Sequence, residues 1–228
     1  MNTRTQRPIP LGLTALVALF SALVALALTG GHDAAAHNDV SHATSAAITQ
    51  KELAFRQDLR KLWEDHVTWT RLAVISMTTD SPDTQTTVAR LLQNQTDIGN
   101  AIKPFYGRAA GTKLTALLRE HILIAADLIG AAKDGDQNAL ASQQARWQAN
   151  ADEIAAFLSN ANPRSWKPAE MRAMMRSHLR LTTNEVVARL TKNWSADIRA
   201  YDRIHVQILQ MADMLSGGLV AQFPSRFR

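Results

Sequence analysis

The stretch LLREHILIAADLI, residues 117–129, decides the class of fold. Its apolar residues recur at intervals of three and four, which is the period of an amphipathic α-helix. His121 lies in the middle of this apolar stripe, between Leu117 and Ile124. The stretch therefore predicts a core helix that carries one buried imidazole.

This stretch lies in one of six segments that have a helical period and are bounded by capping or turn residues. Ala, Leu, Met, Gln, Arg and Glu dominate these segments, and no window of alternating β-branched residues competes with them. Connections of three to eight residues make neighbouring helices antiparallel. The sequence predicts an all-α protein, an antiparallel up-and-down bundle of about six helices, and shows no evident internal repeat. The expected helices cover residues 47–78, 82–103, 112–133, 137–160, 168–191 and 195–218.

The first 36 residues have the character of a secretory signal. Arg4 and Arg7 precede an apolar run of about twenty residues, and an Ala-x-Ala pattern places a cleavage site after Ala36. The run is also long enough to remain as an uncleaved membrane anchor at residues 9–29. In either case we expect a secreted or cell-envelope protein. The expected organisation is a signal or anchor at 1–36, a polar tether at 37–46, a helical bundle at 47–222 and a tail at 223–228.

Composition excludes several classes of function. The chain has no cysteine, which excludes disulfides, thiolate metal sites and cysteine nucleophiles. The net charge of +5 is scattered along the chain without a basic run, so we expect no nucleic-acid partner. The sequence also lacks a Gly-x-Ser-x-Gly elbow, a phosphate-binding loop and a His-Glu-x-x-His motif, so it offers no standard enzyme signature.

Four histidines occupy comparable positions in four different expected helices. Each of His66, His121, His178 and His205 has apolar residues three or four positions away. Each also lies within a few residues of the middle of its helix. For His66 this holds if the first helix begins around Leu53, and His66 is about one turn from the middle if the helix begins at Ala47. The sequence therefore predicts that four inward-facing imidazoles share one layer of the bundle.

Such a layer has two interpretations. Histidine and carboxylate side chains that face the inside of a bundle are typical ligands of Fe, Mn, Zn or Cu. Histidines that are buried and hydrogen-bonded can equally be ordinary core residues. The candidate ligands are His66, His121, His178, His205, Glu185 and Asp202, and the candidate residues around them are Asn94, Asp97, Asn150 and Tyr201.

Methionines gather in the last two expected helices. Thioether sulfur together with histidine is typical of Cu(I) sites, whereas methionine at helical spacing is more often flexible core packing. We interpret this cluster as core packing. It consists of Met171, Met174, Met175, Met211 and Met214.

The segments KLWEDHVTWTR, LLQNQTDIGNAIKPFYG, HLRLTTNEVVARL and ADIRAYDRIHVQILQMADMLSGGLVAQFP resemble a functionally uncharacterised family of secreted, signal-bearing helical proteins of Gram-positive type. The resemblance covers about residues 53–227. It implies an extracytoplasmic all-α protein and supplies no catalytic residue. Labels such as glycosyltransferase or acetylglutamate kinase accompany proteins of this kind, and no residue pattern in the chain supports either.

Three functions remain open at this point. The first is an extracytoplasmic binding protein that holds a metal ion or a small polar ligand in a buried layer of histidine and acid. The second is a non-catalytic structural or interaction protein of the cell envelope, with the histidines as core groups. The third is a transferase-type enzyme, as the labels suggest. The expected partners are a small polar ligand or an envelope component, with membrane contact only through the N-terminal segment. The oligomeric state is left open.

Overall fold

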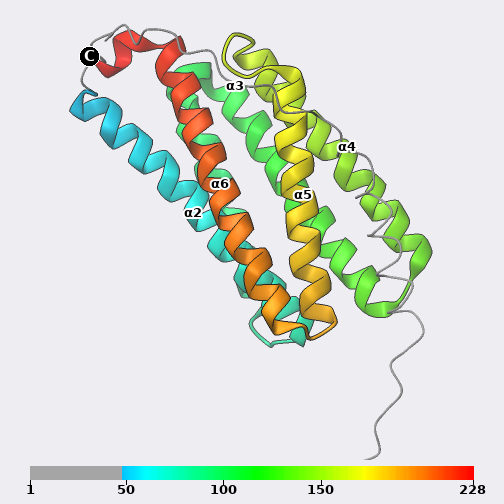
Figure 1. The fold of residues 1–228 in the computed structure, drawn as a ribbon. Coiled ribbons are helices and arrows are strands. Elements are labelled where there is room, and N and C mark those ends of the chain that lie inside the picture. Colours follow the sequence, from blue (N-terminus) through cyan, green and yellow to red (C-terminus); the bar gives the residue numbers. More distant parts are fainter. Residues whose placement is uncertain (1–47) are drawn as a thin grey trace, which may run out of the picture.

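The computed structural model describes residues 48–228 and is all-α, with no strand in that range (Figure 1). The expected signal at 1–36 and the tether at 37–46 lie outside the described residues. The elements are α2 (Gln50–Thr79), α3 (Thr84–Asp134), α4 (Gln137–Ala161), α5 (Pro168–Leu190), α6 (Trp194–Gln222) and the short 3₁₀ helix η1 (Pro224–Phe227).

Side-chain caps set the starts of three of these helices. The side chains of Thr49, Asp136 and Asn193 accept hydrogen bonds from the backbone N–H three residues later, which satisfies a donor that the helix itself leaves free. Pro168 begins α5, where its missing N–H costs nothing. The sequence predicts Ser195 as the cap of the last helix, but Asn193 takes this role and the helix begins earlier.

Residues 48–228 form five α-helices rather than the expected six, because the second and third expected helices form a single element, α3. Gly107 is the one residue inside α3 with non-helical backbone angles (φ 84°, ψ 170°). A Cβ atom added to Gly99 would lie 2.7 Å from the carbonyl oxygen of Gly111. Residues this far apart in a straight helix are separated by about 18 Å, so α3 folds back on itself at the kink. We call residues 84–106 and 108–134 its first and second arms.

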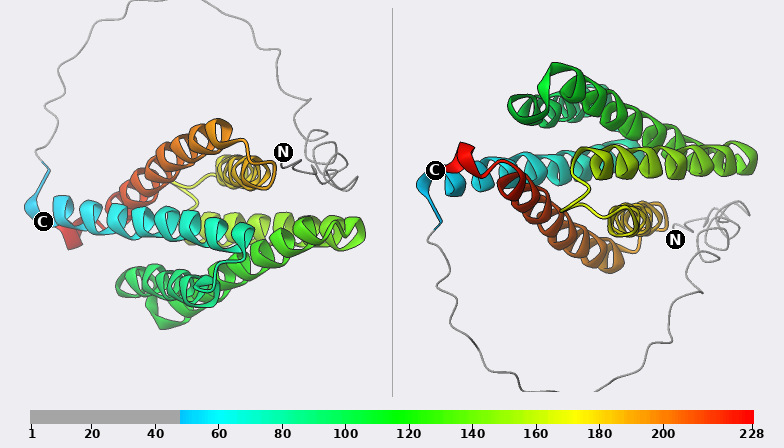
Figure 2. Two further views of the ribbon diagram at one scale, coloured as in Figure 1. Left: turned by 90° about the horizontal axis from the view of Figure 1, so that it is seen from below. Right: turned by 90° about the horizontal axis from the view of Figure 1, so that it is seen from above.

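The helices pack around one main core. Helix α2 contacts α3 and α6, α4 contacts α3 and α5, and α5 contacts α6. Figure 2 shows the two arms of α3 on one side of the molecule and the α5–α6 pair on the other, with α2 and α4 between them. The main hydrophobic cluster draws residues from all five helices and from Trp166, which lies in the α4–α5 connection.

The C-terminal residues pack against the start of α2 (Figure 1). The Thr49 hydroxyl donates to the carbonyl oxygen of Phe227, and Lys51 Nζ donates to the carbonyl oxygen of Arg228 at 2.7 Å. The ring of Phe227 is buried against Phe55, with 5.0 Å between the ring centroids. The end of the chain therefore closes this end of the bundle.

Trp166 is held at the same end by a close approach of α6. Its indole is 1% exposed, and a Cβ atom added to Gly218 would lie 2.1 Å from Trp166 Nε1. We expect Gly218→Ala to lower the free energy of unfolding by about 1–3 kcal/mol, because the added methyl group would overlap the indole and force the ring or the backbone of α6 to shift. Gly217→Ala is the matched control, since its Cβ would meet nothing closer than Arg56 Nη1 at 3.6 Å. Urea denaturation that finds the two variants equal would contradict this account of the packing.

Candidate site: a cavity lined by three histidines

Three of the four histidines come together inside the bundle. His66 of α2, His121 of α3 and His178 of α5 are 3%, 4% and 5% exposed. The ring centroid of His178 lies 6.0 Å from that of His66 and 6.2 Å from that of His121. All three rings line the same cavity, which encloses about 40 Å³. This volume is enough for an ion or one or two water-sized molecules.

Each of the His121 and His178 rings is hydrogen-bonded to a side-chain amide on the next helical segment. His121 Nδ1 lies 2.8 Å from Asn150 Oδ1, and His178 Nδ1 lies 3.2 Å from Gln207 Oε1. Because an amide oxygen only accepts, the hydrogen-bond network assigns the ring hydrogen to Nδ1 in both residues. The Nε2 atom of each ring is then left with a free lone pair.

The hydrogen bond of His66 runs in the opposite direction, with the ring nitrogen as acceptor. The amide nitrogen of Gln95 lies 3.3 Å from His66 Nδ1 and also donates to the carbonyl oxygen of Leu91 at 2.8 Å. The bond to Leu91 fixes which end of the amide faces the ring. His66 Nδ1 is therefore assigned as the acceptor, and its hydrogen lies on Nε2.

We call the hydrogen bonds between the three histidine rings and their side-chain amides the clamps. The three clamps are copies of one repeated arrangement. In each case 29 residues separate the histidine from its amide partner. An amide also donates to the backbone carbonyl four residues before each histidine, at distances of 3.0, 3.1 and 3.4 Å. The histidines lie in LRKLWEDHV (59–67), LTALLREHI (114–122) and MRAMMRSHL (171–179), which share apolar residues seven, four and three positions before the histidine and one after it. The chain thus contains a threefold repeat that the sequence analysis misses.

The cavity is lined by equivalent positions of this repeat. In each copy of the repeat, the residue three positions before the histidine lines the cavity. Two further lining residues lie four and eight positions after the amide residue that donates to the backbone carbonyl, which is Asn94, Asn150 or Gln207. The repeat therefore builds the wall of the cavity as well as the clamps. These residues are Trp63, Leu118 and Met175; Ile98, Ile154 and Met211; and Ile102, Leu158 and Leu215.

Burial keeps the three imidazoles neutral. It lowers the pKa of both His66 and His121 to about 3, and the other buried histidines add to the effect. Burial also lowers the pKa of His178. A neutral imidazole can donate a lone pair, whereas a protonated one cannot.

His205 and the two acidic candidates do not belong to this layer. His205 Nε2 lies 2.5 Å from Glu64 Oε1, in a contact between side chains that are 34% and 44% exposed. The neighbouring Ile204 is buried in the core at 1% exposure, and Asp202 is exposed. The layer therefore contains histidines and amides but not the acids that the sequence predicts.

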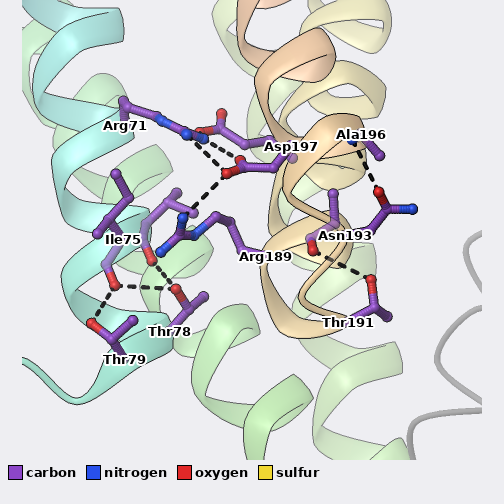
Figure 3. A network of polar contacts seen from close by, with 12 residues as sticks. Arg71, Ile75, Thr78, Thr79, Arg189, Thr191, Asn193, Ala196 and Asp197 are labelled. Carbon is purple, nitrogen blue, oxygen red and sulfur yellow. Dashed lines mark hydrogen bonds and ion pairs between the residues drawn. The ribbon is translucent and has the colours of Figure 1, made fainter.

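Glu185 belongs to a separate buried ion-pair network. Figure 3 shows three other members of this network, Arg71, Arg189 and Asp197. Arg71 of α2 donates to Glu185 of α5 at 2.6 Å and makes two bonds to Asp197 of α6. Arg189 also donates to Asp197, at 3.2 Å. The hydrogen bond to Asp197 raises the pKa of Arg71, and burial raises that of Glu185. Burial alone would raise the pKa of Asp197, but the bonds from Arg71 and Arg189 lower it on balance.

The structure places the other candidates at different distances from the rings. Asn150 bonds His121 directly, as described above. Asn94 donates to the carbonyl oxygen of Leu62. Asp97 accepts a bond from Gln93 at 2.9 Å, away from the rings. Tyr201 lies beside His205, with 6.1 Å between the ring centroids.

Gln95 and Gln207 are site residues that the sequence analysis does not single out. The signal that identifies them is an amide 29 residues after an inward histidine. That signal has meaning only once the pairing of the helices is known.

Within residues 48–228, no three or more His, Asp or Glu side chains are placed to hold one metal ion together. Nor is any helix in this part of the chain long and apolar enough to cross a membrane. No protein-family model, curated protein or solved structure matches the chain.

Proposed function

We propose that this chain is an extracytoplasmic binding protein that holds one small ligand in the cavity between His66, His121 and His178. The observation that carries the proposal is the convergence of three imidazoles from three helices on one enclosed cavity. Residues 1–36, with the character of a secretory signal, support the location outside the cytoplasm.

The energetics of the core support a ligand site. A buried polar group without a partner costs about 1–3 kcal/mol, and His121 Nε2 is buried and has no hydrogen-bond partner within residues 48–228. A leucine at this position would avoid that cost. The amide clamps orient the rings, as groups around a metal or ligand site commonly do for the residues that bind.

The expected up-and-down topology is part of this proposal. In it the chain forms three helical hairpins: α2 with the first arm of α3, the second arm of α3 with α4, and α5 with α6. The clamp bonds support this description, because each joins the two members of one such pair. The first segment of each hairpin then supplies one histidine to the common cavity.

A second candidate is a structural or interaction protein of the cell envelope whose histidines only tie the helices together. The clamps favour it, because all three Nδ1 atoms already have amide partners within the protein. In this case the cavity would remain without a specific ligand.

Native mass spectrometry separates the two candidates. The full chain is purified without a His-tag from the cells that secrete it, and its mass is compared before and after acid denaturation. We expect one released ligand from the wild type and from His205→Ala, because His205 lies outside the cavity. We expect none from folded His121→Ala. An empty wild-type protein, or equal ligand content in the two variants, would support the structural candidate.

A further inference from the structure

The number of free lone pairs in the cavity limits which ligand fits. His121 and His178 direct their ring hydrogens at amide oxygens, so each offers an Nε2 lone pair. His66 is assigned its hydrogen on Nε2 and offers none unless the Gln95 amide turns over. Two nitrogen donors are too few for Zn, which takes four ligands, or for the octahedral sites that suit Mn.

Two sulfur atoms accompany the imidazoles. Met175 of α5 and Met211 of α6 line the same cavity and are 5% and 4% exposed. Met175 also lies one helical turn before His178. Thioether and imidazole together form a soft donor set, which selects copper(I) over harder cations.

Charge favours a monovalent ion as well. The described residues that line the cavity include no acidic side chain. The cost of moving an ion out of water rises with the square of its charge, so a divalent ion with only neutral ligands is penalised far more than a monovalent one. Copper(I) carries a single charge and accepts two or three ligands.

The separation of the rings agrees with this coordination. Two imidazoles that bind one ion from opposite sides through bonds of about 2.0 Å have ring centroids roughly 6 Å apart. The centroids of His121 and His178 lie 6.2 Å apart. Buried His121 Nε2 has no partner among the described residues, as expected of a nitrogen reserved for a ligand.

We infer that the cavity binds one copper(I) ion through Nε2 of His121 and Nε2 of His178, with the sulfur of Met175 or Met211 as a third ligand. This inference rests on the proposed ligand-binding function and names the ligand. His66 has an accessory role, because it must first transfer its ring hydrogen to Nδ1.

The test is an anaerobic titration of the full chain with copper(I), in competition with a colorimetric copper(I) chelator. His37→Ala and His42→Ala are built into every sample, because imidazole is a general copper ligand and these two histidines are not part of the inferred site. We expect one equivalent to bind. His121→Ala and His178→Ala should each weaken binding by roughly 100-fold or more, as loss of groups at a metal site commonly does. His205→Ala is the matched control and should bind like the parent.

Further variants test the details of the site. Met175→Leu combined with Met211→Leu should weaken binding by about tenfold and remove sulfur from the X-ray absorption spectrum of the bound copper. His66→Gln should have a smaller effect than His121→Ala. X-ray absorption on the parent protein should show two imidazole nitrogens and sulfur, and this measurement does not depend on how any variant folds.

Three results would overturn the inference: no saturation at one equivalent of copper(I), equal binding by His121→Ala and His205→Ala, or tighter binding of Zn(II) than of copper(I). The protein could fail to bind copper(I) in the titration while the secreted wild type still releases another ligand that His121→Ala lacks. In that case only the identity of the ligand is wrong. If copper fails and the secreted protein is empty, the proposed function fails as well.

Discussion

The metal-free protein is expected to lose stability steeply as the pH falls below about 6.5, and to unfold near pH 4–5. The folded-state pKa values of His66 and His121 are about 3, against 6.5 in the unfolded chain, and that of His178 is also lowered. Below pH 6.5 the unfolded chain therefore binds protons that the folded protein does not. The stability that these groups contribute is fully present above pH 6.5 and is lost as the pH approaches 3.

The size of this effect is comparable with the stability of a whole domain. One pKa unit corresponds to about 1.4 kcal/mol, so each of His66 and His121 contributes on the order of 4–5 kcal/mol to the loss. A typical domain is stable by about 5–15 kcal/mol.

Urea denaturation between pH 4 and 8, with a chelator present, measures this effect. The slope of unfolding free energy against pH should correspond to two or three protons near pH 5. His121→Gln should flatten the slope by about one proton. A wild-type slope below one proton would show that the rings are not buried in the neutral form.

Removal of the Arg71 guanidinium is expected to lower the free energy of unfolding by about 3–5 kcal/mol. Arg71→Ala would leave Glu185 and Asp197 buried, at 1% exposure each, without their main cationic partner. Arg189 contacts only Asp197 among the ion pairs of this network, at 3.2 Å, so it does not replace Arg71 beside Glu185.

Arg60→Ala is the matched control, because it also breaks an arginine–aspartate pair between α2 and α6. The side chains of Arg60 and Asp213 are 43% and 51% exposed, although their distance is only 2.7 Å. Exposed pairs contribute about 0–1 kcal/mol, so Arg60→Ala should be nearly neutral. Urea denaturation at pH 7 that finds equal losses for the two variants would contradict a special role for the buried network.

The helices could be predicted from the sequence because their signals are local. Apolar period, capping residues and proline positions depend on neighbours within a few residues. Pro104 and Gly107 also gave a local signal, which predicted the end of a helix near residue 103 where the structure has a kink inside α3. The sharpness of the kink had no local signal, because the close contact of Gly99 with Gly111 joins the two arms of the helix.

His205 shows where local pattern fails. Successive residues of a helix are rotated by about 100°, so two overlapping stripes can both look apolar. In α6 the stripe through Ile204 and Ile208 faces the core, and both side chains are at most 1% exposed. Asp202, three residues before His205, marks the other stripe as the outer one.

The repeat was hidden for a different reason. Its shared features are a histidine, an amide 29 residues later and a few apolar positions, and the amino acids at those positions differ between copies. Only contacts between helices show that Gln95, Asn150 and Gln207 each form a hydrogen bond with a buried histidine ring.

The sequence by itself determined the all-α class and the approximate ends of most helices, because these follow from the periodicity and capping residues of single segments. It predicted inward positions for four histidines, of which His66, His121 and His178 are buried. The tertiary structure alone decided which imidazoles meet, which amides hold them and that Glu185 pairs with Arg71 instead. These outcomes depend on the rotation of each helix about its axis and on its neighbours. Both are set by packing between segments far apart in the chain.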